Sequence, residues 1–259
     1  MKKIFLFISF FLILVLHPAS SQIVTQNNAF VTGEEFVLDA YYHLGFMWFK
    51  VGTAVFSVSE ENGNYLFTVT CNNYPQWNWL YEVKTKHVAS CTKDMKPIYM
   101  WCDVVENGKH HTDSYKYKVY DDRYEIHRVL KSEKYPNTLD TIFSMPLEAH
   151  DIINSIYVAR NADLTVNNGK MIPFYPIFGN KIHMMYGNVL GKKDIVTREG
   201  DKYRCTKNTA VVGGGTIVDN SEPVYVYVTD DERRIPVLVE TKLSLGYVKV
   251  YLKNYSIKK

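Results

Sequence analysis

The chain has 259 residues, with 30 Lys and Arg against 27 Asp and Glu, and 14% of its residues are aromatic, including 20 Tyr. This near balance of charge argues against a general nucleic-acid binder, which carries a basic surface. A chain of this length can bury a sizeable core without metal or disulfide support, as one large β domain or two smaller ones.

The first 21 residues have the pattern of a secretory signal peptide. Lys2 and Lys3 precede thirteen residues, 4–16, of which all but one are apolar, and small residues follow up to position 21. This apolar run is shorter than the about 20 residues that a membrane-spanning helix needs. We therefore expect cleavage, export to the periplasm or cell envelope, and a mature chain, residues 22–259, that forms a single β-rich domain without a transmembrane span.

Most of the mature chain alternates apolar and polar side chains with a period of two, which predicts β-strands. Asn62-Gly63 and Asn107-Gly108 each separate two such segments and predict hairpin turns. The predicted strands are residues 34–43, 51–59, 65–71, 97–106, 109–120, 123–131, 170–177, 181–189, 192–198, 202–209, 224–229, 235–242 and 247–254. The last three predict a meander.

Residues 149–160 depart from this pattern and predict a helix. One helical stripe carries the apolar side chains Ile152, Ile153, Ile156 and Tyr157. Asp151 in the first turn and Arg160 near the last both match the helix dipole. A second, shorter helical turn is expected within residues 76–81.

Many short strands, short turns and one amphipathic helix together predict an all-β fold. We expect a single antiparallel, strongly curved sheet, a barrel or half-barrel, with the helix packed against it. Curvature or closure of this kind limits the number of exposed strand edges.

Four cysteines, Cys71, Cys91, Cys102 and Cys205, lie in the mature chain. An even number in an oxidising compartment suggests disulfides, and Cys91 and Cys102 are the candidate pair because they flank a predicted turn at residues 93–97. The alternative is four partly buried free thiols. No Cys-x-x-Cys pair is present, which argues against a thioredoxin-like redox site.

An aromatic segment offers the best candidate for ligand binding. Tyr74, Trp77 and Trp79 crowd one short stretch with Asn and Gln between them, and Trp48 lies in another loop-like stretch. Aromatic faces beside amides suit a saccharide or an apolar ligand such as a lipid. The alternative is an aromatic plug that closes one end of the curved sheet.

A tight turn near the C-terminus offers a second candidate. Asp230 and Arg233 could present a carboxylate and a guanidinium at the sheet rim to a polar ligand. The alternative is turn chemistry, in which Asp bonds its own backbone, Arg pairs with it and Pro236 begins an outer strand.

The hairpin at Asn107-Gly108 places Cys102 opposite Asp113, with His111 on the same face. That set could bind a metal or form part of a cysteine nucleophile site, and its alternative is ordinary cross-strand pairing. No Gly-x-Ser-x-Gly, His-Glu-x-x-His, P-loop or Gly-x-Gly-x-x-Gly motif is present. The sequence therefore nominates no catalytic residue, metal or cofactor.

Several segments carry a family resemblance. They are Gly33-Glu34-Glu35-Phe36, residues 41–45 and 51–54, the helix from Asp151 to Arg160, Thr197-Arg198-Glu199-Gly200, residues 203–205, and Val228 to Val237 followed by residues 246–248. In this order the chain resembles the family catalogued as domain of unknown function 3108, a group of exported bacterial proteins. One departure is Tyr225 and Tyr227 in a strand where the family often has Trp. The resemblance implies an exported β-rich fold and supplies no activity or catalytic residues.

These observations favour a non-catalytic exported envelope protein that binds an apolar or saccharide ligand, a lipid or a glycan, in the curved sheet. One alternative is an envelope scaffold that binds a protein partner and has a solid core. A hydrolase with an unrecognised site is the remaining alternative.

Overall fold

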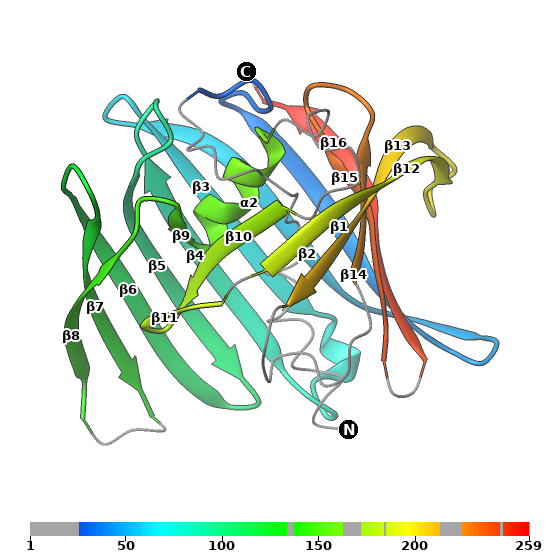
Figure 1. The fold of residues 1–259 in the computed structure, drawn as a ribbon. Coiled ribbons are helices and arrows are strands. Elements are labelled where there is room, and N and C mark those ends of the chain that lie inside the picture. Colours follow the sequence, from blue (N-terminus) through cyan, green and yellow to red (C-terminus); the bar gives the residue numbers. More distant parts are fainter. Residues whose placement is uncertain are drawn as a thin grey trace.

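The computed structural model describes residues 26–133, 137–162, 172–183, 185–212, 224–243 and 246–258. The predicted signal segment, residues 1–21, and the start of the strand predicted at residue 170 lie outside this described part. Within it, one large antiparallel sheet curves around a single α-helix (Figure 1). This confirms the predicted fold class, in its half-barrel form.

The elements follow one another with short connections. They are β1 (Glu34–Leu44), β2 (Met47–Glu61), β3 (Asn64–Asn73), the 3₁₀ turn η2 (Pro75–Trp77), β4 (Val83–Cys91), β5 (Pro97–Glu106), β6 (Lys109–Val119), β7 (Tyr124–Ser132), β8 (Leu139–Met145), β9 (Ala149–Asp151), α2 (Ile152–Arg160), β10 (Ile172–Phe178), β11 (Lys181–Ile182), β12 (Met185–Val196), β13 (Lys202–Val212), β14 (Val224–Thr229), β15 (Pro236–Lys242) and β16 (Tyr247–Ile257).

The strand order brings the two ends of the described chain together. The order is β11-β10-β12-β13-β14-β15-β16-β1-β2-β3-β4-β5-β6-β7-β8, with β9 parallel to β10. β1 therefore pairs with β16 on one side and with β2 on the other. The sheet does not close on itself, because β8 and β11 are not paired with each other.

Both Asn-Gly turns have the backbone that the sequence predicts. Asn62 and Gly63 have φ of 51° and 78°, and Asn107 and Gly108 have φ of 49° and 73°. Positive φ at both central residues matches the twist of the flanking strands. The predicted register follows, since Cys102 lies opposite Asp113.

The helix begins three residues later than predicted. Residues Ala149–Asp151 form β9, which pairs in parallel with β10, and α2 starts at Ile152. Asp151 caps the helix by accepting hydrogen bonds from the backbone N–H groups of Ile153 and Asn154 at 3.1 and 3.0 Å. The second predicted helical turn is limited to η2.

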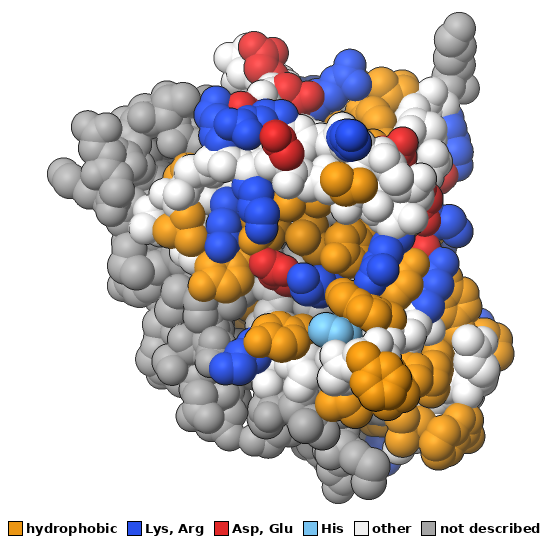
Figure 2. All heavy atoms as spheres, turned by 90° about the vertical axis from the view of Figure 1, so that its right-hand side faces the viewer, with side chains coloured by type: hydrophobic (Ala, Val, Ile, Leu, Met, Phe, Trp, Pro, Cys, Tyr) orange, Lys and Arg blue, Asp and Glu red, His pale blue; other side chains and the backbone are white. Residues whose placement is uncertain are grey.

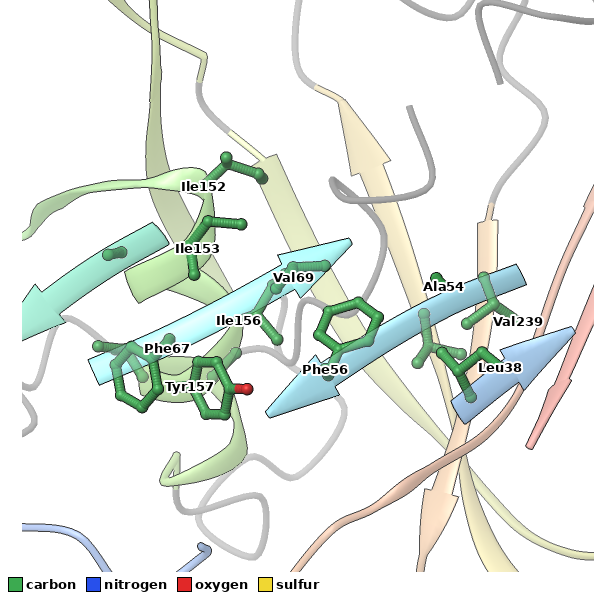
Figure 3. Packing of buried hydrophobic residues seen from close by; sticks show 14 of the residues in the cluster. Leu38, Ala54, Phe56, Phe67, Val69, Ile152, Ile153, Ile156, Tyr157 and Val239 are labelled. Atoms are coloured by element: carbon green, nitrogen blue, oxygen red, sulfur yellow. The ribbon is translucent and has the colours of Figure 1, made fainter. Parts of the chain in front are cut away.

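The helix lies inside the curve of the sheet and is buried on all sides, so even its polar side chains need partners within the protein. Tyr157 stacks on Phe67 of β3 with ring centroids 3.8 Å apart, and Phe36 stacks on Phe56 at 4.6 Å. Figure 3 shows Ile156 and Tyr157 directed toward these strand residues. The part of the concave face that surrounds α2, in the upper half of Figure 1, is therefore filled by side chains.

The predicted disulfide between Cys91 and Cys102 is wrong. All four cysteines are free, buried thiols. In the β4–β5 register Cys91 lies opposite Pro97, whereas Cys102 lies opposite His87, four residues further along β4. Four residues of strand span about 13 Å, and a disulfide needs Cα atoms within about 7 Å.

Candidate functional site

Three of the segments that carry the family resemblance meet around Arg160 at one end of the half-barrel. Arg160 ends α2 and is 0% exposed. Glu34 begins β1, and the third segment is the turn between β14 and β15. Gly33 precedes Glu34 with φ of 89°, and a Cβ there would lie 2.1 Å from the carbonyl oxygen of Lys258. Only glycine fits at this position.

All three nitrogens of the Arg160 guanidinium donate hydrogen bonds within the protein. The guanidinium donates to both carboxylate oxygens of Glu34 at 2.5 and 3.0 Å, to the carbonyl oxygen of Ala29 at 2.9 Å, and to that of Arg233 at 3.1 and 2.9 Å. Tyr255 donates its hydroxyl to Glu34 at 3.3 Å. Such additional hydrogen bonds help a buried ion pair to offset the cost of its desolvation.

The β14–β15 turn is ordered by Asp231, a residue that sequence reasoning did not select. Its Oδ1 accepts from the hydroxyl of Thr229 at 2.6 Å and from the N–H groups of Arg233 and Arg234 at 3.1 Å each. Arg234 then donates to the carbonyl oxygen of Arg160 at 2.6 Å. The turn and the end of α2 therefore bind each other in both directions.

The predicted Asp230–Arg233 pair does not form. Asp230 binds Lys192 at 2.6 Å, and the Arg233 guanidinium approaches the Tyr255 hydroxyl at 3.4 Å. Arg233 lines a cavity of about 350 Å³, which is formed by Asn28, Ala29, Phe30, Val31, Glu34, Asp231, Glu232, Arg233 and Tyr255. Since Glu34 and Asp231 are engaged in structural hydrogen bonds, this cavity offers no pair of carboxylates arranged for acid–base chemistry.

Trp48 lies at a different place, on the convex face of the sheet. Its ring stacks on His43 at 4.1 Å, and the guanidinium of Arg198 lies 4.0 Å from its centroid. Arg198 comes from the β12–β13 turn and also lies over Tyr41 and Tyr251, at 5.2 and 5.4 Å. Figure 2 shows hydrophobic side chains interspersed with Lys and Arg on this side of the molecule. Trp48 is thus already in contact with a cation and an imidazole.

Tyr74 and Trp77 are anchors. The Tyr74 hydroxyl lies 2.8 Å from that of Thr53 and donates to the buried carboxylate of Asp39 at 3.3 Å. The Trp77 indole donates to the carbonyl oxygen of Lys50 at 2.8 Å, and its ring meets the edge of Phe49 at 5.7 Å. Both side chains attach the segment after β3 to the sheet.

Trp79, in contrast, projects into solvent from a loop that is held firmly. Asn73 donates to Asn78 and to the carbonyl oxygen of Tyr81, both at 3.0 Å, and accepts from the N–H of Val83 at 2.7 Å. The loop is thus closed around one buried amide, while Trp79 is 79% exposed.

Exposed apolar side chains gather at this end of the sheet. They lie on the β1–β2 hairpin, on the loop after η2 and at the start of β16, which are all at the lower end in Figure 1. We call Phe46, Met47, Trp48, Trp79, Leu80 and Tyr247 the aromatic end. Phe46, at the hairpin tip, is 90% exposed, and sequence reasoning missed it because a single Phe in a short loop gives no periodic signal.

The face that carries Cys102, His111 and Asp113 does not form a metal or nucleophile site. Arg128 binds Asp113 through both carboxylate oxygens, at 2.7 to 3.1 Å. Burial raises the pKa of the Cys102 thiol to about 12, so the thiol is protonated at neutral pH. Among the described residues no group of three His, Cys, Asp or Glu side chains is arranged to hold a metal ion.

The buried ion pair gives a first prediction. Glu34→Gln should leave the Arg160 charge without a carboxylate and lower the free energy of unfolding by about 3–5 kcal/mol. Arg160→Met should cost a similar amount, and the double variant should cost clearly less than the sum of the two. Urea unfolding of the four proteins measures this. Glu60→Gln, at the exposed Lys93–Glu60 pair, is the control and should cost less than about 1 kcal/mol. Additive losses would contradict the pairing.

His87, opposite Cys102, gives a second prediction. Burial, together with nearby His111, lowers its pKa to about 4, against about 6.5 in an unfolded chain. Between these values the unfolded state binds more protons, so stability should fall as the pH drops from about 6.5 to about 4, by up to about 3 kcal/mol. Over this pH range the free energy of unfolding of His87→Gln should fall by up to about 3 kcal/mol less than that of the wild type. His127→Gln, at an exposed strand position, is the control, and equal slopes in wild type and His87→Gln would refute the prediction.

Comparison with solved structures finds a protein with a similar fold. A crystal structure of a β-barrel-like protein of the domain of unknown function DUF1849 from Brucella abortus has a TM-score of 0.59 and 8% identity, covering 89% of this chain and 100% of that one. At this identity the likeness shows the fold alone.

Two further crystal structures are more distant. A protein from Bacteroides fragilis, provisionally described as exported and with a YmcC-like fold, has a TM-score of 0.34 and 12% identity, covering 91% of this chain and 100% of that one. A protein from Parabacteroides distasonis, provisionally described as a lipoprotein, has a TM-score of 0.32 and 10% identity, covering 90% of this chain and 99% of that one.

No curated protein matches the sequence. A family model described as "Protein of unknown function (DUF3108)" matches residues 38–253, and the chain therefore belongs to this family.

Proposed function

We propose that the chain is an exported, non-catalytic protein of the cell envelope that binds a lipid surface through its aromatic end. The signal-peptide pattern of residues 1–21 supports export. The observation that carries the lipid assignment is the exposure of Phe46 and Trp79 on two loops at the same end of the sheet.

Large apolar side chains that are exposed together at one end of a protein mark a candidate site of interaction. Burying Phe46 and Trp79 in an apolar environment contributes roughly 2–3 kcal/mol for each side chain. Because the loop that carries Trp79 is already ordered by Asn73, little conformational entropy is lost on binding.

The chemistry of the aromatic end fits lipid better than saccharide. A sugar stacks on free aromatic faces, and among the tryptophans of the aromatic end the ring of Trp48 is covered by His43 and Arg198, which leaves Trp79 alone for such stacking. Phe46 and Met47 present only apolar surface. Trp, Tyr and neighbouring basic groups, such as Arg198 and Lys249, are typical of the boundary between lipid headgroups and acyl chains.

The concave face gives less support to the ligand site that the sequence suggested. In the described residues it is filled by α2 near Arg160, and the candidate tryptophans Trp48, Trp77 and Trp79 lie on the convex face or at the end of the sheet. A cavity of about 350 Å³ beside Arg233 and another of about 270 Å³ are lined by neither Trp48, Trp77 nor Trp79. No helix in the described part of the chain is long and apolar enough to cross a membrane.

Vesicle flotation tests the proposal. The mature chain, residues 22–259, should float with phosphatidylcholine vesicles, and more strongly when phosphatidylglycerol is added, because anionic headgroups attract the basic side chains. The double variant Phe46→Ser with Trp79→Ser should lower vesicle affinity at least about tenfold. Val119→Ser is the matched control and should bind as wild type does. Val119 is an exposed apolar side chain at the end of β6, outside the aromatic end.

Tryptophan fluorescence gives an independent readout of the same contact. Vesicles should shift the emission of the wild type to shorter wavelength, and Trp79→Phe should remove most of that shift while keeping the binding. Absence of flotation with either vesicle, or flotation unchanged by the double variant, would overturn the lipid proposal. A complex with soluble glycan in place of vesicle binding would favour the saccharide alternative.

A further inference from the structure

We propose that the free edge of β8 pairs with the same strand of a second copy of this chain, forming a two-fold symmetric dimer. β8 ends the strand order, and among the described strands it pairs only with β7. It is the outermost strand on the left of Figure 1. Its outer row of backbone N–H and C=O groups is therefore available to another strand.

This edge lacks the features that normally prevent such pairing. Edge strands are commonly protected by Lys, Pro, a bulge or very short length. β8 has seven residues, and its pairing with β7 runs without a register shift from Tyr124–Met145 to Leu130–Leu139. Its single charged side chain, Asp140, is already bound to His127 at 2.7 Å. Ile142, at its centre, is 65% exposed.

The opposite edge of the sheet is different. β11 has only two residues, begins with Lys181 and follows a tight turn at Gly179. This edge is short and charged, as natural sheet edges usually are. The contrast makes β8 the available edge of the half-barrel.

The sequence of β8 is complementary to itself in the antiparallel direction. A two-fold axis perpendicular to the sheet, midway between Ile142 and its copy, keeps the convex faces of the two copies on the same side and pairs all seven residues. Ile142 then lies opposite its copy, Asp140 opposite Ser144, Thr141 opposite Phe143 and Leu139 opposite Met145. No like charges lie opposite each other, and Ile142, the most exposed apolar side chain of β8, lies against its copy.

These features identify a second copy as the occupant, because the same seven residues satisfy both sides of an isologous interface. Any other register of this symmetric pairing leaves part of the strand unpaired and Ile142 away from its copy. A single pair of strands buries less surface than the roughly 1,200–2,000 Å² of a stable interface, so the dimer should be weak and depend on concentration.

Sedimentation velocity over a concentration series tests the dimer. The mature chain should shift reversibly from monomer to dimer as its concentration rises. Ile142→Lys and Ile142→Glu should each raise the dissociation constant at least about tenfold, because like charges then meet at the axis. An equimolar mixture of the two variants should recover association, since the charges opposed at Ile142 are then of opposite sign.

Val119→Lys, at an exposed apolar position on β6, is the matched control and should dimerise as wild type does. Circular dichroism and thermal unfolding check that each variant is folded. A wild type that is monomeric at every concentration would overturn the proposal. So would a dimer that survives Ile142→Lys, or charge variants that fail to associate when mixed.

Discussion

The arrangement of this fold depends on the burial of one guanidinium. Arg160 has no access to water, so every donor that it directs inward must find an acceptor in the protein. It finds the carboxylate of Glu34 and the carbonyl oxygens of Ala29 and Arg233. The N-terminal segment, the helix and the β14–β15 turn are thereby joined. Because β1 pairs with both β16 and β2, the contact fixes α2 to the place where the first and last described strands meet.

That constraint determines which surfaces remain for binding. With α2 fixed inside the curve, Tyr157 and its apolar neighbours fill the concave face against Phe67 and Phe56. The exposed aromatic side chains of the described residues, Phe46, Trp48, Trp79 and Tyr247, lie at the other end of the sheet and on the convex face. The hairpin and loop that carry Phe46 and Trp79 are held by the strands and by Asn73, so they form a preorganised surface.

Local patterns predicted most of the fold, and contacts between distant residues escaped prediction. The Asn-Gly turns set the register of their hairpins, including the pairing of Cys102 with Asp113. β4 was missed because its core-facing positions include polar Thr85 and His87, and β8 was missed because its short length and exposed side chains leave a weak pattern. The disulfide prediction is wrong because the β4–β5 register separates Cys91 from Cys102 along their strands. Of the ligand-binding candidates, Trp48 and Trp79 belong to the aromatic end, whereas no sequence pattern pairs Arg160 with Glu34, 126 positions away.

Native-state hydrogen exchange tests the central role of Arg160 most directly. The amide of Ala29 donates to Asn161 and reports on the N-terminal segment, and the amide of Ile235 donates to Thr229 and reports on the β14–β15 turn. The amide of Ile156 reports on the helix. If the buried guanidinium unites these segments, the three amides should exchange through one opening, with the same free energy and the same dependence on denaturant. Exchange of Ala29 and Ile235 through separate openings of much lower free energy than that of Ile156 would contradict the account.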